Sequence, residues 1–203
     1  ISAINEARIV RFLTKPCPPD ALAEAIDDAL EQARLARAEK ELLNRTLKGM
    51  VGLLTDVLGL VSVAAYARTQ RIETIVTSLS AGVGRPVPWD LSLAAKLSQL
   101  GFVVLHEPGE DRSDPHHVEL AVDLLVNIPR METVAHAVGH QLDEAPVGGV
   151  GDWTAWARKD ANAEILRVAV RFDALTAAGA SVEEAYRAIA SSATPPPRML
   201  LDA

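Results

Sequence analysis

A regular alternation of four-residue and three-residue steps separates the apolar positions in the early part of the chain. From residue 22 to residue 61 only one of these positions, Lys40, is polar. Its first eight positions, which we call the seam, are Leu22, Ile26, Ala29, Ala33, Ala36, Lys40, Leu43 and Leu47. This is the heptad spacing of helices that pair along one stripe. The pattern therefore predicts a long N-terminal helix that forms a coiled coil.

The residues beside the seam change character at Gly49. Before Gly49 the flanking residues are charged, namely Glu31, Arg34, Arg37 and Glu39. After it they are apolar, namely Val51, Leu53, Leu58 and Leu60. A helix with apolar residues on more than one stripe belongs in a larger core, so we expect the helix to enter one there.

Two interpretations of the seam stay open. One is a homodimer paired through residues 19–48, and the other is a single amphipathic helix that packs on its own domain. Lys40 favours the dimer, since a lysine at a seam position can extend its ammonium group outward to water.

The rest of the chain reads as helices separated by short breaks rich in glycine, proline and polar residues. The helical patterns cover residues 66–80, 91–100, 116–126, 131–141, 153–178 and 182–191. One β-strand is expected, at residues 8–14, where Ile, Val and Phe are frequent. The fold class is therefore all-α with five to seven helices after the long helix. The predicted divisions are residues 1–18, 19–48 and 49–203.

Charge and composition exclude several functional classes. The net charge is -7 and basic residues are interspersed with acidic ones, so no electrostatic footprint for nucleic acid is present. No apolar run reaches the length of a membrane span. Cys17 is the single cysteine, which fits a reducing compartment. We therefore expect a cytoplasmic protein that contacts neither nucleic acid nor membrane.

The first 22 residues resemble the end of a receiver domain, the phosphorylated domain of response regulators. The resemblance rests on Lys15 and Pro16 directly after the expected strand and ahead of a helix, with Phe12 inside the strand. It implies that Lys15 contacts a phosphoryl group and that Pro16 follows a cis peptide bond. The phosphoacceptor aspartate would lie before Ile1, so we expect this chain to be a piece of a longer protein.

Residues 47–201 resemble the HD-GYP branch of the HD superfamily of metal-dependent phosphohydrolases. The most specific match is residues 168–176, VAVRFDALT, beside a family motif similar to VADVFDALT. The metal-binding aspartate of that motif aligns with Val170, whereas the FDALT tail is kept. We expect Asp173 within that tail to have a structural role.

The other motifs of the family keep their frame but lose most ligands. Residues 94–102, AAKLSQLGF, are similar to a helix end that carries a His-Asp pair, and here Ser98 and Gln99 fill the pair. His117 matches a retained family histidine, which we expect at the surface or beside the old pocket. His140 and Gln141 stand at a later histidine-glutamate element. The glycines at 148–151 lack the Tyr-Pro of the family loop.

These replacements argue against catalysis. A two-metal phosphohydrolase needs several carboxylate and imidazole ligands around one point. Ser98, Gln99 and Val170 supply neither group, so we expect no metal and no cofactor. The prediction is a non-catalytic output module of a two-component response regulator, which relays the receiver state through a dimeric helix to a partner protein. Two alternatives stay open: a cyclic di-GMP phosphodiesterase with unusual ligands, and an inactive domain that still binds the nucleotide.

Two further polar groups share helix faces. His136 and His140 are four residues apart, a spacing that can bind a transition metal, although no third ligand is evident. The basic residues Arg158, Lys159, Arg167 and Arg171 recur at near-helical spacing. We expect these four to form a solvated face.

Overall fold

The computed structural model describes residues 17–103, 116–144, 158–192 and 195–201. The expected strand at residues 8–14, Lys15, Pro16, the glycines at 148–151 and the side chain of Lys40 lie outside the described residues. The chain divides into two compact units, Ile1–Met50 and Val51–Ala203.

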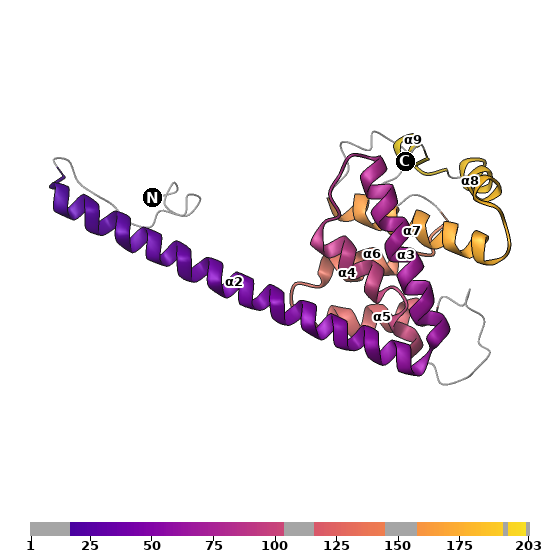
Figure 1. The fold of residues 1–203 in the computed structure, drawn as a ribbon, viewed down its shortest axis with the longest axis horizontal. Helices are drawn as coiled ribbons and strands as arrows, with labels where there is room; N and C mark the ends of the chain where they lie inside the picture. Colours follow the sequence, from indigo (N-terminus) through magenta and orange to yellow (C-terminus); the bar gives the residue numbers. More distant parts are fainter. Residues whose placement is uncertain (1–16, 104–115, 145–157, 193–194, 202–203) are drawn as a thin grey trace. The chain divides into compact units, whose positions relative to one another are not determined.

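All the regular structure in the described residues is helical, which confirms the all-α class (Figure 1). The helices are α2 (Pro19–Val61), α3 (Val63–Gly82), α4 (Trp89–Leu97), the 3-10 helix η1 (Leu100–Val103), α5 (His116–Val126), α6 (Glu132–Gly139), α7 (Arg158–Ala177), α8 (Val182–Ala190) and α9 (Arg198–Leu201). Seven α-helices, α3 to α9, thus follow the long helix in this part of the chain, within the predicted five to seven. Among the described residues, no helix combines the length and the apolar character that a membrane span requires.

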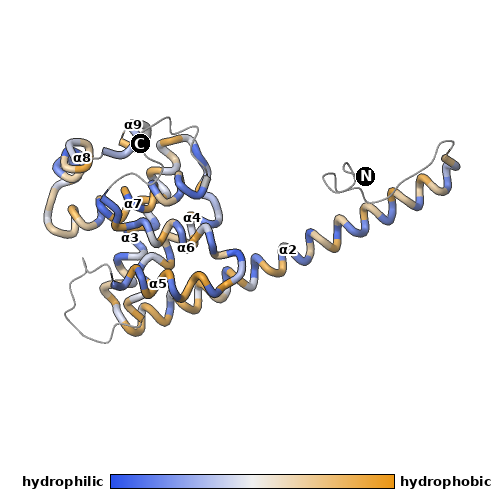
Figure 2. The backbone as a smooth tube through the Cα atoms, turned by 180° about the vertical axis from the view of Figure 1, so that it is seen from behind, coloured by the Kyte–Doolittle hydropathy of each residue, from blue (hydrophilic) through white to orange (hydrophobic). Residues whose placement is uncertain are grey.

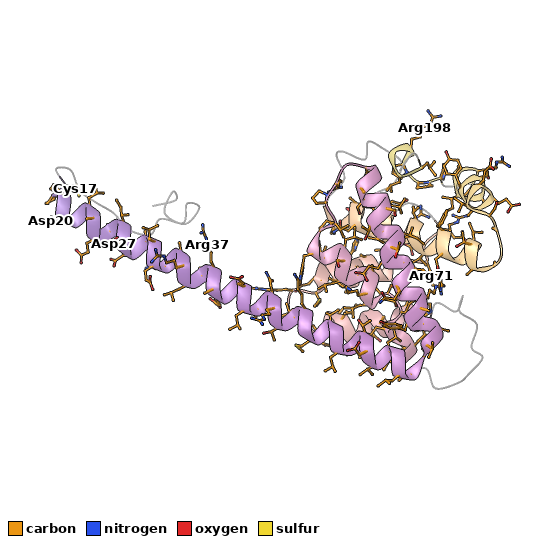
Figure 3. All side chains as sticks on the ribbon, in the orientation of Figure 1. Cys17, Asp20, Asp27, Arg37, Arg71 and Arg198 are labelled. Atoms are coloured by element: carbon orange, nitrogen blue, oxygen red, sulfur yellow. The ribbon has the colours of Figure 1, made fainter. Side chains whose placement is uncertain are left out.

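Helix α2 begins at Pro19, with Asp20 in its first turn (Figure 3). A proline there forgoes an amide that has no helical partner, and an early carboxylate favours the positive end of the helix dipole. Hydrophobic and hydrophilic residues alternate along α2 (Figure 2). Leu22 and Ile26 of the seam are 45% and 51% exposed, and Leu43 is 38% exposed.

The second unit contains the last turns of α2. Val51 and Leu58 are buried there, as the apolar flanks predict. Leu53 and Leu60 stay exposed, at 64% and 87%, so the helix enters the core with only part of its apolar flanks. The apolar surface of these turns is wider than the face that the second unit covers.

Helix α7 is the centre of the second unit. Every described residue from 161 to 170 is buried, and α7 packs against α3, α4, α6 and α8. Helix α5 packs on α6 (Figure 1). It also packs on η1. Small residues, Ala161, Ala163 and Ala169 among them, let neighbouring helices approach α7 closely. The segments around Ser98, Gln141 and Val170 all belong to this packed centre.

Candidate functional site

Ser98, Gln99 and Gln141 form one buried polar cluster. Ser98 and Gln99 follow the end of α4, and Gln141 follows the end of α6. The Gln141 side-chain amide donates to the Ser98 carbonyl oxygen over 3.0 Å, and the Gln99 amide donates to Ser98 Oγ over 3.3 Å. Three of the positions that the family resemblance assigns to the metal site therefore meet in space.

The cluster leaves two polar atoms without a partner. Gln99 Oε1 and Gln141 Oε1 are buried and have no hydrogen-bond partner among the described residues. A buried acceptor that forms no hydrogen bond costs about 1–3 kcal/mol of folding free energy. Neutral amides and a hydroxyl cannot serve as a general base, and they bind divalent metals weakly. The cluster is therefore polar but lacks the groups of a hydrolytic centre.

His117 is buried, so the first of its two expected positions, at the surface, is wrong. Its ring stacks on Phe102 of η1, with ring centroids 4.5 Å apart and planes 21° apart. A Cβ added to Gly101 would lie 1.8 Å from the His117 carbonyl oxygen. The start of α5 thus touches the backbone of η1, which only glycine permits here.

His140 takes no part in that cluster. Its Nδ1 lies 2.6 Å from Asp143 Oδ2, and its ring meets the ring of His136 edge-on with centroids 4.5 Å apart. His136 Nε2 lies 2.9 Å from Asp160 Oδ1 of α7. The two histidines share one face as predicted, and each contacts a carboxylate. Within the described residues, however, no three or more His, Cys, Asp or Glu side chains are arranged to hold a metal ion.

Val170 is buried in the middle of α7 and presents only methyl groups. Its neighbours Ala169 and Val168 are buried as well. The position that the resemblance assigns to a metal-binding aspartate is thus part of the apolar core of α7.

Asp173 has the structural role that the sequence predicted. The carboxylate is 1% exposed, and it pairs with Arg71 Nε at 2.5 Å and with Arg68 Nε at 3.3 Å. The hydrogen bond to Asp173 raises the pKa of Arg71 above its ordinary value. Two guanidinium groups of α3 neutralise this carboxylate, so it joins α7 to α3 and is not available as a ligand or base.

Arg167 departs from the predicted solvated basic face. It is 2% exposed and donates from Nε and Nη2 to the two carboxylate oxygens of Glu164 over 2.8 and 2.6 Å. Its Nη1 donates to the carbonyl oxygens of Asp143 and Glu144 over 3.4 and 3.3 Å. This buried pair fixes the segment that follows Gln141. A glutamate three residues before an arginine, inside an apolar helix, is the sequence signal that we overlooked.

A family model described as the HD domain matches residues 52–194. No curated protein matches the chain. No solved structure matches it either. The receiver resemblance of residues 1–22 lies outside the matched range and stays a prediction.

Proposed function

Because the chain belongs to the HD domain family through residues 52–194, we propose that it is a catalytically inactive member that works as the output module of a two-component response regulator. In this proposal the receiver state is relayed through residues 19–48 of a dimeric helix to a partner protein. The family as a whole suggests metal-dependent phosphohydrolase chemistry, so the proposal depends on what this chain has in place of the ligands.

The observation that carries the proposal is which residues occupy the positions that the resemblance assigns to metal ligands. Gln99 and Gln141 each donate to Ser98, and Val170 contributes only methyl groups. The domain keeps its buried core and its packed central helix around these positions. A scaffold that is maintained without its ligands favours a role in binding a protein over a role in hydrolysis.

The dimer part of the proposal is supported by the exposed seam. Leu22, Ile26 and Leu43 repeat at heptad positions and present more than a third of their surface to solvent. Burying apolar side chains of this size contributes about 1.5–3 kcal/mol each when burial is complete. A second copy of the same helix offers the matching stripe, which supports a homodimer as the resting state.

Catalysis is tested first. The protein is purified without oxygen, supplied with Fe²⁺ or Mn²⁺, and analysed for bound metal and for cyclic di-GMP hydrolysis. We expect less than one metal ion per chain and a rate equal to that of metal alone, while circular dichroism shows a folded protein. Two bound metal ions together with turnover would overturn the proposal and favour a cyclic di-GMP phosphodiesterase with unusual ligands. Tight cyclic di-GMP binding without turnover would instead favour a nucleotide-binding domain.

Dimerisation is tested with a matched pair of variants on α2. Leu43→Glu places a charge on the seam, whereas Leu35→Glu places the same charge on another face of α2, at a residue that is 61% exposed. Light scattering after gel filtration should give a dimer for the wild type and for Leu35→Glu, and a monomer for Leu43→Glu. A wild-type monomer, or equal effects of the two variants, would contradict the dimer.

The relay is tested in a parent protein that carries a complete receiver. A Lys40→Cys substitution in a Cys17→Ala background reports the distance between the two helices by disulfide formation. The yield should change when the receiver is phosphorylated. The same yield in both states would contradict transmission through α2.

A further inference from the structure

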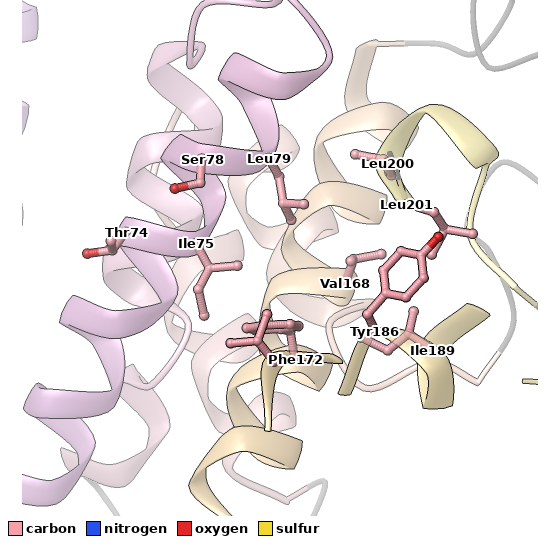
Figure 4. A pocket seen from close by; sticks show the side chains of 11 residues that line it. Thr74, Ile75, Ser78, Leu79, Val168, Phe172, Tyr186, Ile189, Leu200 and Leu201 are labelled. Atoms are coloured by element: carbon pink, nitrogen blue, oxygen red, sulfur yellow. The ribbon is translucent and has the colours of Figure 1, made fainter. Parts of the chain in front are cut away.

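A cavity of about 380 Å³ lies between α3, α7, α8 and α9 (Figure 4), and the described residues that line it include none of the positions that the resemblance assigns to the metal site. Its floor is formed by the buried side chains of Val168, Ile189 and Leu200. Ile75 and Leu79 of α3 line one side (Figure 4). The volume falls within the range of about 300–1,000 Å³ that is typical of small-molecule sites.

Helix α8, which lines one side of the cavity, buries only half of its apolar stripe. Ala185 and Ile189 are buried, whereas Val182 and Tyr186 of the same stripe are 69% and 43% exposed. Val182 and Tyr186 both line the cavity. Carbon surface next to an open apolar space loses dispersion contacts that a ligand could restore.

The backbone on both sides keeps the cavity from closing. Helix α8 starts with a reciprocal cap between Ser181 and Glu184, directly after a turn in which Gly179 has a φ of 100°. Helix α9 follows the three prolines at 195–197, whose φ angles are fixed by their rings. Leu200 then anchors α9 in the core. The open space is thus held by the fold on each side.

The lining also determines the charge of the ligand. The cavity has no charged side chain among the described residues that line it, and its polar groups are the hydroxyls of Thr74, Ser78 and Tyr186. Thr74 Oγ1 already donates to the Gln70 carbonyl oxygen. An ion placed here would lose water without gaining a counter-charge, which is unfavourable. An uncharged ligand meets no such cost.

We propose that this cavity binds a small neutral amphiphile, with an alkyl or flat apolar body against Val168, Ile189 and Leu200 and one hydroxyl or carbonyl group near Tyr186. This binding site goes beyond the proposed output function and does not depend on it. It requires neither a metal nor the dimer.

The test uses the neutral fluorescent probe N-phenyl-1-naphthylamine and its displacement by 1-decanol or by decanoate. We expect saturable binding of one probe per chain, displaced by the alcohol at a concentration at least about tenfold lower than by the anion. Binding that does not saturate, or better displacement by decanoate, would overturn the proposal.

Two matched substitutions place the probe in the cavity. Val182 and Val63 are both the first residue of a helix after a serine cap, and they are 69% and 75% exposed, but only Val182 lines the cavity. Val182→Trp should weaken probe binding by about tenfold or more, whereas Val63→Trp should leave it unchanged. Ser78→Trp fills the cavity from α3 and should act like Val182→Trp.

The exposed seam of α2 is the competing site for an apolar probe. Leu43→Glu should therefore leave the titration unchanged. Saturable probe binding that is lost in Leu43→Glu but kept in Val182→Trp would overturn the proposal. All variants are compared at equal helix content and melting temperature.

Discussion

Arg71 donates two hydrogen bonds to the carboxylate of Asp173, from Nε to Oδ1 over 2.5 Å and from Nη2 to Oδ2 over 3.2 Å. The two residues are 102 positions apart in the chain. Arg68, one turn earlier on α3, lies on the same carboxylate. This three-residue pairing joins α3 to the central helix α7.

We therefore expect Asp173→Asn to lower the free energy of unfolding by about 3 kcal/mol or more, because it removes the buried carboxylate that pairs with both Arg68 and Arg71. Arg71→Gln should cost only about 1 kcal/mol, since the Arg71 side chain is 47% exposed and water screens it. Urea denaturation measures both. Arg187→Gln, which breaks the exposed pair with Glu183, is the control and should change almost nothing. A larger loss for Arg71→Gln than for Asp173→Asn would contradict this account.

The contact between Gly101 and the His117 carbonyl oxygen gives a second prediction. Gly101→Ala should destabilise the domain by about 2 kcal/mol or more, because backbone must move to admit the methyl group. Gly52→Ala has open space around it, within helix α2, and should stabilise by about 0.5–1 kcal/mol. Thermal denaturation of the two variants should thus shift in opposite directions. A neutral Gly101→Ala would show that α5 and η1 are not in such close contact.

Restoring the ligands tests the alignment of the old metal site. The variant Ser98→His, Gln99→Asp, Val170→Asp places charge in a buried region, so it should melt well below the wild type when metal is chelated. Added Mn²⁺ should raise its melting temperature, because binding to the folded state stabilises it. The wild type should show no such response to Mn²⁺. An equal response in both proteins, or none in the variant, would mean that these three positions do not converge on one metal.

The cap of α8 makes the stability of the domain depend on pH in the acidic range. The Ser181 backbone amide donates to Glu184 Oε2 over 2.8 Å, and this bond is the main cause of a Glu184 pKa below its ordinary value of 4.5. A lowered carboxylate pKa contributes stability that is complete above pH 4.5 and is lost as the pH falls through the folded-state value. Glu184→Gln should therefore differ from the wild type by a constant amount above about pH 5, and the difference should shrink on acidification. A difference in melting temperature that is the same at pH 3 and pH 7 would contradict this prediction.

Sequence patterns predicted the helices well where periodicity and breaks agreed. The segment 116–126 coincides with α5, and 182–191 exceeds α8 by one residue, Ser191. The start of α3 was predicted at residue 66, three residues after its true first residue, Val63, because Ser62 was not identified as its cap. A serine can sit inside a helix or cap one, and only the surrounding packing decides between the two.

The site was harder to predict because its pairing depends on contacts between distant residues. The resemblance identified Ser98, Gln99 and Gln141, which do meet, but residue types alone did not reveal the hydrogen bonds among them. Burial of His117 and Arg167 follows from the close approach of η1 to α5 and from the partner Glu164. The contact of η1 with α5 has no signature in local spacing, whereas the i,i+3 spacing of Glu164 and Arg167 was a signal that we overlooked. Homodimerisation through the seam and the receiver fragment remain predictions.

The junction of α2 and α3 consists of one residue, Ser62. Its amide donates to the Leu58 carbonyl oxygen over 2.7 Å, and its hydroxyl accepts from the Ala65 amide over 3.2 Å. Just beside it, the Tyr66 ring lies 3.4 Å from where a Cβ on Gly59 would be. The two backbone dihedrals of Ser62 are thus the only torsions between the last residue of α2 and the first residue of α3 that belong to neither helix. If the last turns of α2 twist or slide, no loop can absorb the movement, and either α3 must move with them or one of the two helices must unwind at its end.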